Sequence, residues 1–230
     1  MPLFERFAAS ACHSERSQGI LGSGSKRNVP ALLTVFTFTT GNRRVNIVVD
    51  NLFRCKGATI MLTDKTNYGL VRHAQEFLAL PTVYLWGGLG QILSLALFHE
   101  IIKRYPDYYT EKKQHEYEGF IDNNYYALDC SGLIKNYLMN GENAFRYNPA
   151  VDYNSKLFIE KSTTKGAICS LPEIPGICLY LEGHVGVYIG NGDVIEATNN
   201  PDFGNGVIKS RLNQRNWEQW FYCPHIIYED

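Results

Sequence analysis

The sequence predicts an α+β fold in which helices pack on a central antiparallel sheet, and two stretches carry this prediction. Residues 126–138 read as a short extended entry that turns directly into a helix. Residues 183–198 read as a β-hairpin, because two β-rich runs flank a Gly-Asn-Gly turn. Between and around them, apolar residues recur at helical or strand spacing. A mixed fold accommodates both patterns.

The composition of the 230 residues is that of an ordinary globular chain. Apolar residues make up 45%, which is enough to bury a core. No run approaches the roughly 18 apolar residues of a membrane span. The net charge of −1 gives no support to a nucleic-acid or membrane-surface partner. The six cysteines are spread out without a Cys-x-x-Cys pair, so we expect neither a zinc site nor a disulfide framework.

Residues 1–60 are predicted to be a poorly structured or dispensable extension. Residues 10–28 are rich in Ser, Gly, Arg and Lys and lack periodicity, whereas residues 32–49 alternate around a turn and favour a marginal β-hairpin. No secretory signal is seen, because charge comes early and no apolar stretch follows. Helix signals begin after Met61. We therefore hypothesise that the native protein starts there and that residues 61–230 form the working domain.

The helix predicted after residue 129 places a cysteine at its start. Asp129 is a good N-cap, and the apolar residues that follow recur at helical spacing until Asn140-Gly141. Cys130 therefore lies at a helix N-terminus, where unpaired N–H groups and the helix dipole favour a thiolate. The alternative interpretation is a small buried cysteine that packs the helix start. Residues 143–172, beyond this helix, are predicted to be loop-like.

The register of the hairpin decides which side chains share a face. A two-residue loop at 191–192 would put Glu196 among core valines. A three-residue loop at 190–192, with Gly192 left-handed in a bulge, instead gives one apolar face. The second register is preferred, and it brings Glu196 within reach of the His184 ring. A histidine with a carboxylate neighbour is an oriented general base, although a surface His–Glu pair is also common.

Three motifs in order resemble those of the NlpC/P60 cysteine peptidases. They are Tyr-Leu-Trp-Gly-Gly at 84–88, Asp-Cys-Ser-Gly-Leu at 129–133, and Gly-His-Val-Gly-Val-Tyr-Ile-Gly-Asn-Gly at 183–192. Pro175-Gly176 is similar to the family's Pro-Gly-Asp turn, although Ile177 replaces the acid. The resemblance spans residues 66–228. It implies a papain-like α+β fold with the nucleophile at a helix N-terminus, in the unpermuted order cysteine, histidine, polar residue.

The resemblance implies a role for each matching residue. Cys130 is the expected nucleophile, and His184 is the expected base, with a thiolate–imidazolium pair as one resting state. Glu196 occupies the third polar position, where the family more often has histidine, and it would orient the ring. Asn199 or Asn200 are possible substitutes for it.

Further site residues are expected around the thiol. The Cys130 N–H and the Tyr84 hydroxyl are candidate oxyanion donors. The candidate substrate-binding residues are Asp129, Ser131, Trp86 and Gly183. For Asp129 and Ser131, helix capping alone remains the alternative.

Residues 89–128 form an insertion relative to the compact family pattern. One interpretation is a lid or lip beside the active-site groove, in which Tyr108, Tyr109 and Tyr117 stack on sugar or peptide. The other is a scaffold on the far side of the domain. Near the C-terminus, Trp217 and Trp220 are predicted to serve packing rather than carbohydrate binding.

The predicted activity is that of a thiol endopeptidase from a bacterium or phage. It would hydrolyse an amide in peptidoglycan stem peptides, next to γ-D-glutamyl, without metal or cofactor. The expected partner is peptidoglycan or a muropeptide, with no nucleic acid and no membrane span. Synthesis in the cytoplasm, with action at the wall through lysis, a phage particle or another export route, is the expected localisation. The alternatives are a phage tail, lysis or toxin component, a non-wall amidase or acyltransferase, and an inactive binding module.

Overall fold

The computed structural model describes residues 33–40, 43–50, 65–140 and 145–229, and the chain divides into two units, Met1–Thr59 and Ile60–Asp230. In the first unit, β1 (Leu33–Thr40) and β2 (Arg43–Asp50) form an antiparallel pair. The other predictions for residues 1–60, and the start at Met61, lie outside the described residues. No helix in the described ranges has the length and apolar character that a membrane crossing requires.

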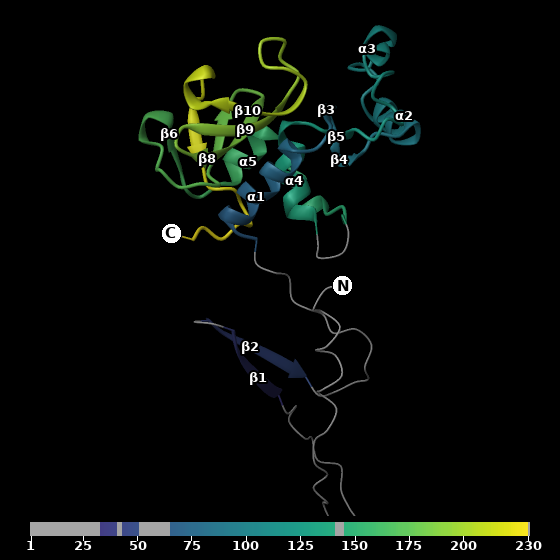
Figure 1. Ribbon diagram of the computed structural model, residues 1–230. Helices are drawn as coiled ribbons and strands as arrows, with labels where there is room; N and C mark the ends of the chain where they lie inside the picture. Colours follow the sequence, from purple (N-terminus) through teal and green to yellow (C-terminus); the bar gives the residue numbers. More distant parts are fainter. Residues whose placement is uncertain (1–32, 41–42, 51–64, 141–144, 230) are drawn as a thin grey trace, which may run out of the picture. The chain divides into compact units, whose positions relative to one another are not determined.

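The second unit is built around a six-stranded antiparallel sheet with the strand order β10-β9-β8-β7-β11-β6 (Figure 1). Its strands are β6 (Lys165–Ala167), β7 (Cys178–Leu181), β8 (His184–Gly190), β9 (Asp193–Thr198), β10 (Gly206–Arg211) and β11 (Gln219–Phe221). Together with the helices, this sheet makes the fold α+β, as predicted.

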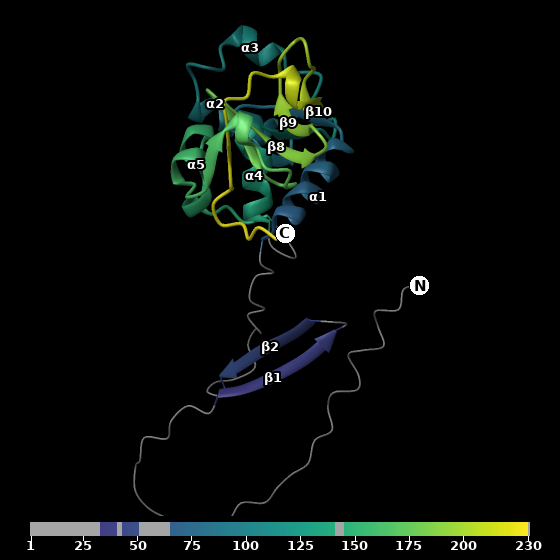
Figure 2. The ribbon, with the colours of Figure 1, turned by 90° about the vertical axis from the view of Figure 1, so that its left-hand side faces the viewer.

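Two helices pack on one face of this sheet, α1 (Asn67–Leu78) and α4 (Cys130–Met139) (Figure 2). Thr66 caps α1, because its side chain accepts a hydrogen bond from the Gly69 N–H. The main core lies between these helices and the strands, with Leu70, Ala74, Leu133, Ile134, Val185, Val187, Ile195 and Ala197 among its buried members.

The region between α4 and β7 is more ordered than its polar sequence predicts. It contains α5 (Ser155–Lys161), the strand β6, and short 3₁₀ turns at Pro149–Val151 and Ile168–Ser170. The loop prediction for residues 143–172 is therefore wrong for these elements. Asn154 caps α5 by accepting a hydrogen bond from Leu157, and Phe158 is fully buried, so a short cap-and-core signal was present.

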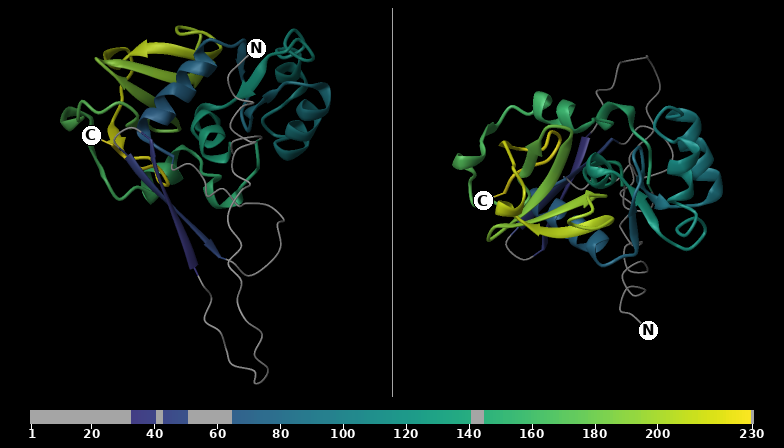
Figure 3. Two further views of the ribbon diagram at one scale, coloured as in Figure 1. Left: turned by 60° about the horizontal axis from the view of Figure 1, so that its bottom comes forward. Right: turned by 90° about the horizontal axis from the view of Figure 1, so that it is seen from above.

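A second, three-stranded sheet connects the start of α4 to the insertion at residues 89–128. It consists of β3 (Thr82–Tyr84), β4 (Leu89–Ile92) and β5 (Tyr126–Leu128), with β5 in the middle. The insertion also forms α2 (Leu95–Arg104) and α3 (Glu111–His115). Figure 3 shows both helices beyond the small sheet, away from the six-stranded one. They pack around their own core of buried residues.

The β8–β9 hairpin has the predicted register along its length. Val187 pairs with Ile195 and Tyr188 with Val194, as a three-residue loop requires. At the tip, however, the prediction is wrong: Gly190 pairs with Asp193, so the loop has two residues instead of three, and the bulge lies between Tyr188 and Gly190 instead of at Gly192. Alternate residues therefore face opposite ways. One face of the hairpin enters the core under α1 and α4, and the opposite face carries His184 and Glu196.

Candidate active site

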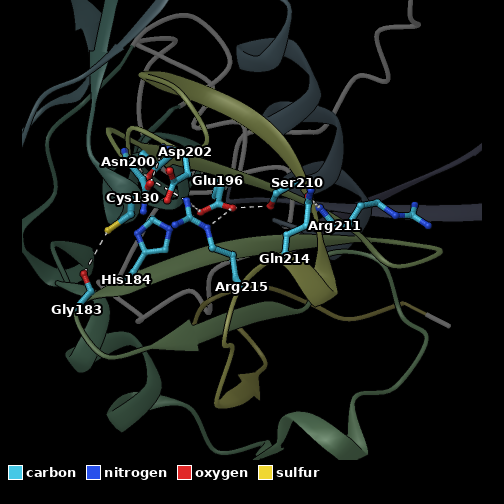
Figure 4. A network of polar contacts seen from close by, with 11 residues as sticks. Cys130, Gly183, His184, Glu196, Asn200, Asp202, Ser210, Arg211, Gln214 and Arg215 are labelled. Carbon is cyan, nitrogen blue, oxygen red and sulfur yellow. Dashed lines mark hydrogen bonds and ion pairs between the residues drawn. The ribbon is translucent and has the colours of Figure 1, made fainter.

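Cys130 is the first residue of α4, and its sulfur lies against the start of β8. The side chain is only 7% exposed, and Sγ donates a long contact of 3.9 Å to the Gly183 carbonyl. A backbone N–H from Val185 also reaches the sulfur. The thiol is therefore bracketed by the backbone on both sides of His184. Figure 4 shows the side chains of Cys130 and His184 near each other at the start of β8.

Asp129 fixes the position of the helix start. Its Oδ1 accepts hydrogen bonds from the Gly132 N–H at 2.6 Å and the Ser131 hydroxyl at 2.8 Å. Its Oδ2 accepts the Gly87 N–H at 2.9 Å, which ties the small sheet's Trp-Gly-Gly turn to α4. These contacts are those of a cap. Substrate contact by Asp129 and Ser131 stays a prediction, as does contact by Gly183, whose exposed backbone lies beside the thiol.

Burial, rather than the helix dipole, controls the charge of the thiol. Desolvation, followed by the nearby Asp129 carboxylate, raises the pKa of Cys130 to about 12, although hydrogen bonds from Val185 and Ser131 oppose this rise. A helix terminus contributes up to about 2 kcal/mol in a partly buried geometry, or about 1.5 pKa units, whereas full burial shifts a pKa by up to about 3–5 units. Burial therefore opposes the expected resting thiolate and favours the neutral thiol, and the resting thiolate–imidazolium pair stays a prediction.

The contact expected between His184 and Glu196 is present. Nε2 of the ring lies 2.6 Å from Oε2 of the carboxylate (Figure 4). Glu196 is 0% exposed, so this contact lies inside the domain. Because Nε2 is committed to Glu196, Nδ1 is the ring nitrogen left to act as a base. Trp217 stacks on the His184 ring, with the two ring centroids 5.7 Å apart and an interplanar angle of 19°.

Glu196 has partners that the sequence prediction missed. Ser210 of β10 donates to Oε1 at 2.5 Å, and Arg215 contacts both oxygens, with Nε at 3.2 Å from Oε1 and Nη2 at 2.8 Å from Oε2. Burial acts to raise the pKa of Glu196, but the hydrogen bonds from His184, Ser210 and Arg215 outweigh it, so the pKa lies below its usual range. Glu196 is therefore an anion held in one orientation.

Neither asparagine that was considered as a substitute contacts the histidine. Within the described part of the chain, the side chain of Asn200 accepts only the Asp202 N–H, and no hydrogen bond joins Asn199 to His184. Trp217 is buried, as the packing prediction requires, yet it packs on the catalytic candidate itself. Trp217 and Arg215 are two positions apart, and in an extended chain this spacing points both side chains the same way. That spacing was the signal in the sequence that linked these two residues.

Tyr84 is the last residue of β3 and pairs with Leu128 of β5, the strand that leads into Cys130. Burial raises the pKa of its hydroxyl, and the Cys130, Asp129 and Tyr108 groups raise it further. Its hydroxyl has no hydrogen-bond partner among the described residues. Tyr84 therefore remains a neutral hydroxyl, and its role as an oxyanion donor stays a prediction.

The insertion contributes aromatic side chains next to Trp86. The exposed Trp86 ring lies 4.7 Å from that of Tyr105 and 4.5 Å from that of Tyr108, while the Tyr109 hydroxyl donates to the Trp86 carbonyl at 2.7 Å. Tyr109 and Tyr117 are 1% and 3% exposed. The prediction that these two stack on substrate is therefore wrong, because they form the insertion's own core. Tyr108 is only partly buried and lies against Trp86, so its contact with substrate stays a prediction.

A comparison with models of known protein families gives a match. Residues 82–225 match the model of the NlpC/P60 family, a stretch that includes the thiol, the imidazole and the carboxylate. A search of curated proteins found no match. Because the family model matches more than half of the sequence, the chain belongs to the NlpC/P60 family.

Proposed function

We propose that this protein is a cysteine endopeptidase that hydrolyses an amide bond in bacterial peptidoglycan stem peptides, next to γ-D-glutamyl. The observation that carries the proposal is the buried His184–Glu196 contact at 2.6 Å, set beside a thiol at a helix N-terminus. The family assignment supports the cysteine hydrolase class and the peptidoglycan substrate. The helix packed on an antiparallel sheet supports a papain-like arrangement.

Acylation begins with the neutral thiol. As the Cys130 sulfur attacks the amide carbonyl carbon, its proton passes to Nδ1 of His184. The negative charge on the substrate oxygen would be stabilised by the Cys130 N–H and the Tyr84 hydroxyl. The intermediate collapses when the C–N bond breaks and Nδ1 gives its proton to the leaving amine. The product is an amine and a thioester on Cys130.

Deacylation uses the same groups in reverse order. His184 removes a proton from water as the water oxygen attacks the thioester carbonyl, and Nδ1 then returns the proton to the departing sulfur. Glu196 accepts the Nε2 hydrogen throughout, so the ring keeps its orientation and its cationic form is stabilised. No metal or organic cofactor takes part in any step.

Peptide mass spectrometry of digested cell walls tests this proposal. Purified sacculi are incubated with the wild type, Cys130→Ala, and Cys169→Ala, a control for a free, exposed cysteine. We expect soluble peptides with new termini beside D-glutamate from the wild type and Cys169→Ala only. No release by folded wild-type protein from walls of several chemotypes would favour a non-wall amidase or acyltransferase. Equal release by Cys130→Ala would refute the assignment.

The site of action follows from the proposed substrate. The protein would reach the cell wall through host lysis, a phage particle or another export route. Infection or lysis assays with and without Cys130→Ala would distinguish a phage lysis component from a host enzyme, because only the former would lose lysis with the variant.

A further inference from the structure

The segment between β10 and β11 carries two side chains that contact the His184–Glu196 pair. Arg215 has an extended backbone, with φ −122° and ψ 148°, and Trp217 follows two positions later. Side chains two apart in an extended chain point the same way. Arg215 reaches the carboxylate and Trp217 covers the imidazole. This segment therefore contacts both members of the pair.

Arg215 is held rigidly at the carboxylate. Its side chain is only 10% exposed, and Nε and Nη2 each contact a different oxygen of Glu196. Nη2 also donates to the Thr198 hydroxyl at 3.1 Å, and the guanidinium lies 3.9 Å from the centroid of the Phe203 ring. Such a forked contact fixes the plane of a carboxylate as well as its charge.

Arg215 supplies the positive charge that balances the buried Glu196 carboxylate. The groups that face the carboxylate are His184 from β8, the uncharged Ser210 from β10, and Arg215. Near the imidazole, α4 presents Cys130, and burial raises the pKa of its thiol. Among the residues that the structure describes, Arg215 is thus the permanent cation in contact with the buried anion. A buried charge without a partner is strongly disfavoured and takes up a proton instead.

We propose that Arg215 is a positioning residue that neutralises Glu196, so that the His184–Glu196 pair carries one proton on Nε2 and leaves Nδ1 free to accept the thiol proton. This inference rests on the proposed roles of Cys130 and His184. It concerns how the base is kept available, and Arg215 touches neither the thiol nor the substrate carbonyl in the proposed reaction.

Without the cation, the pair binds a second proton at neutral pH, and both places for that proton block the base. On the ring it produces an imidazolium with hydrogens on both nitrogens. On the carboxylate it produces an acid that donates to Nε2, which moves the ring hydrogen to Nδ1. In either case Nδ1 carries a hydrogen and cannot accept another from the thiol.

The test is the pH dependence of Cys130 alkylation by iodoacetamide, followed by mass spectrometry of the Cys130 peptide. In this reaction an S–C bond forms, iodide leaves, and the thiol proton passes to Nδ1. For Arg215→Met, we expect the midpoint of the rise in rate to move to higher pH by roughly one to three units. Arg215→Lys keeps the charge but loses the fork, so its midpoint should lie in between.

Two controls separate this effect from general damage. Arg211→Gln removes a nearby arginine whose partner is Asp193 on the surface, and its midpoint should stay at the wild-type value. The double variant Glu196→Gln/Arg215→Met removes both charges, so its alkylation midpoint should return toward the wild-type value. This variant tests the inference even if Arg215→Met alone folds poorly. A structural role alone would predict no such return.

The opposite results would overturn the inference. They are a midpoint in folded Arg215→Met that stays unchanged or moves to lower pH, or a double variant that shifts as far as the single one. NMR titration of the His184 imidazole should show the same direction as the alkylation. Because iodoacetamide replaces the wall substrate, a failure to digest sacculi would count against the proposed function and leave this inference standing.

Discussion

Asp129 is predicted to stabilise the domain far more than an ordinary helix cap, because it also joins α4 to the small sheet. Asp129→Ala removes the hydrogen bonds to Gly132, Ser131 and Gly87. Loss of a cap costs about 1 kcal/mol, and each stranded, partly buried donor costs about 1 kcal/mol more, so the free energy of unfolding should fall by roughly 2–4 kcal/mol.

Thermal and urea unfolding measure this loss directly. For a domain of this size, the expected fall in Tm is roughly 5–15 °C. Ser94→Ala is the matched control, because Ser94 caps α2 through one bond to Leu97 at 3.2 Å and should cost about 1 kcal/mol. Asp129→Asn keeps the bond to Gly132 but turns an amide donor toward Gly87, so its loss should be intermediate. A fall in Asp129→Ala no larger than in Ser94→Ala would refute the reasoning.

Three further predictions concern pH, packing and reactivity. Burial lowers the pKa of His73 to about 4 from an ordinary 6.5, so the unfolded chain binds the proton more readily between these values, and stability is complete above pH 6.5. By pH 5 the free energy of unfolding should fall by about 2 kcal/mol, and His73→Leu should remove this part of the pH dependence in urea titrations. Gly132→Ala would place a Cβ 2.2 Å from the Gly88 carbonyl oxygen, so the free energy of unfolding should fall by at least about 2 kcal/mol. Gly119→Ala is the control, because its Cβ would meet open space, and it should leave the stability unchanged. Equal melting curves for the two variants would contradict this prediction. Glu196→Gln should slow iodoacetamide labelling of the active-site thiol at pH 7 by roughly tenfold or more, and an unchanged rate would show that the carboxylate does not support the base.

The features that sequence predicted well are local ones. The cap at Asp129 acts on a residue three positions later, and the hairpin register depends on alternation within residues 183–198. These patterns determine which face each side chain occupies. They therefore predicted that Glu196 would reach His184, and the structure places the two 2.6 Å apart.

The features that sequence could not predict depend on packing between distant segments. Arg215 meets Glu196 because the chain returns after β10, and no spacing rule reveals that contact. The charge of the Cys130 thiol depends on how completely α4 and β8 exclude water from it. Tyr109 and Tyr117 lie in an aromatic segment without clear periodicity, so the sequence did not separate a buried core from an exposed lip.

The most direct test of the Cys130–His184 pair is competitive labelling within one sample. The wild type and His184→Ala are exposed briefly to iodoacetamide at pH 7, and the labelled fractions of Cys130 and the exposed Cys169 are compared by mass spectrometry. If His184 activates the thiol, its removal should abolish labelling of Cys130 and leave that of Cys169 unchanged. Equal labelling of Cys130 in both proteins would contradict the proposed pair.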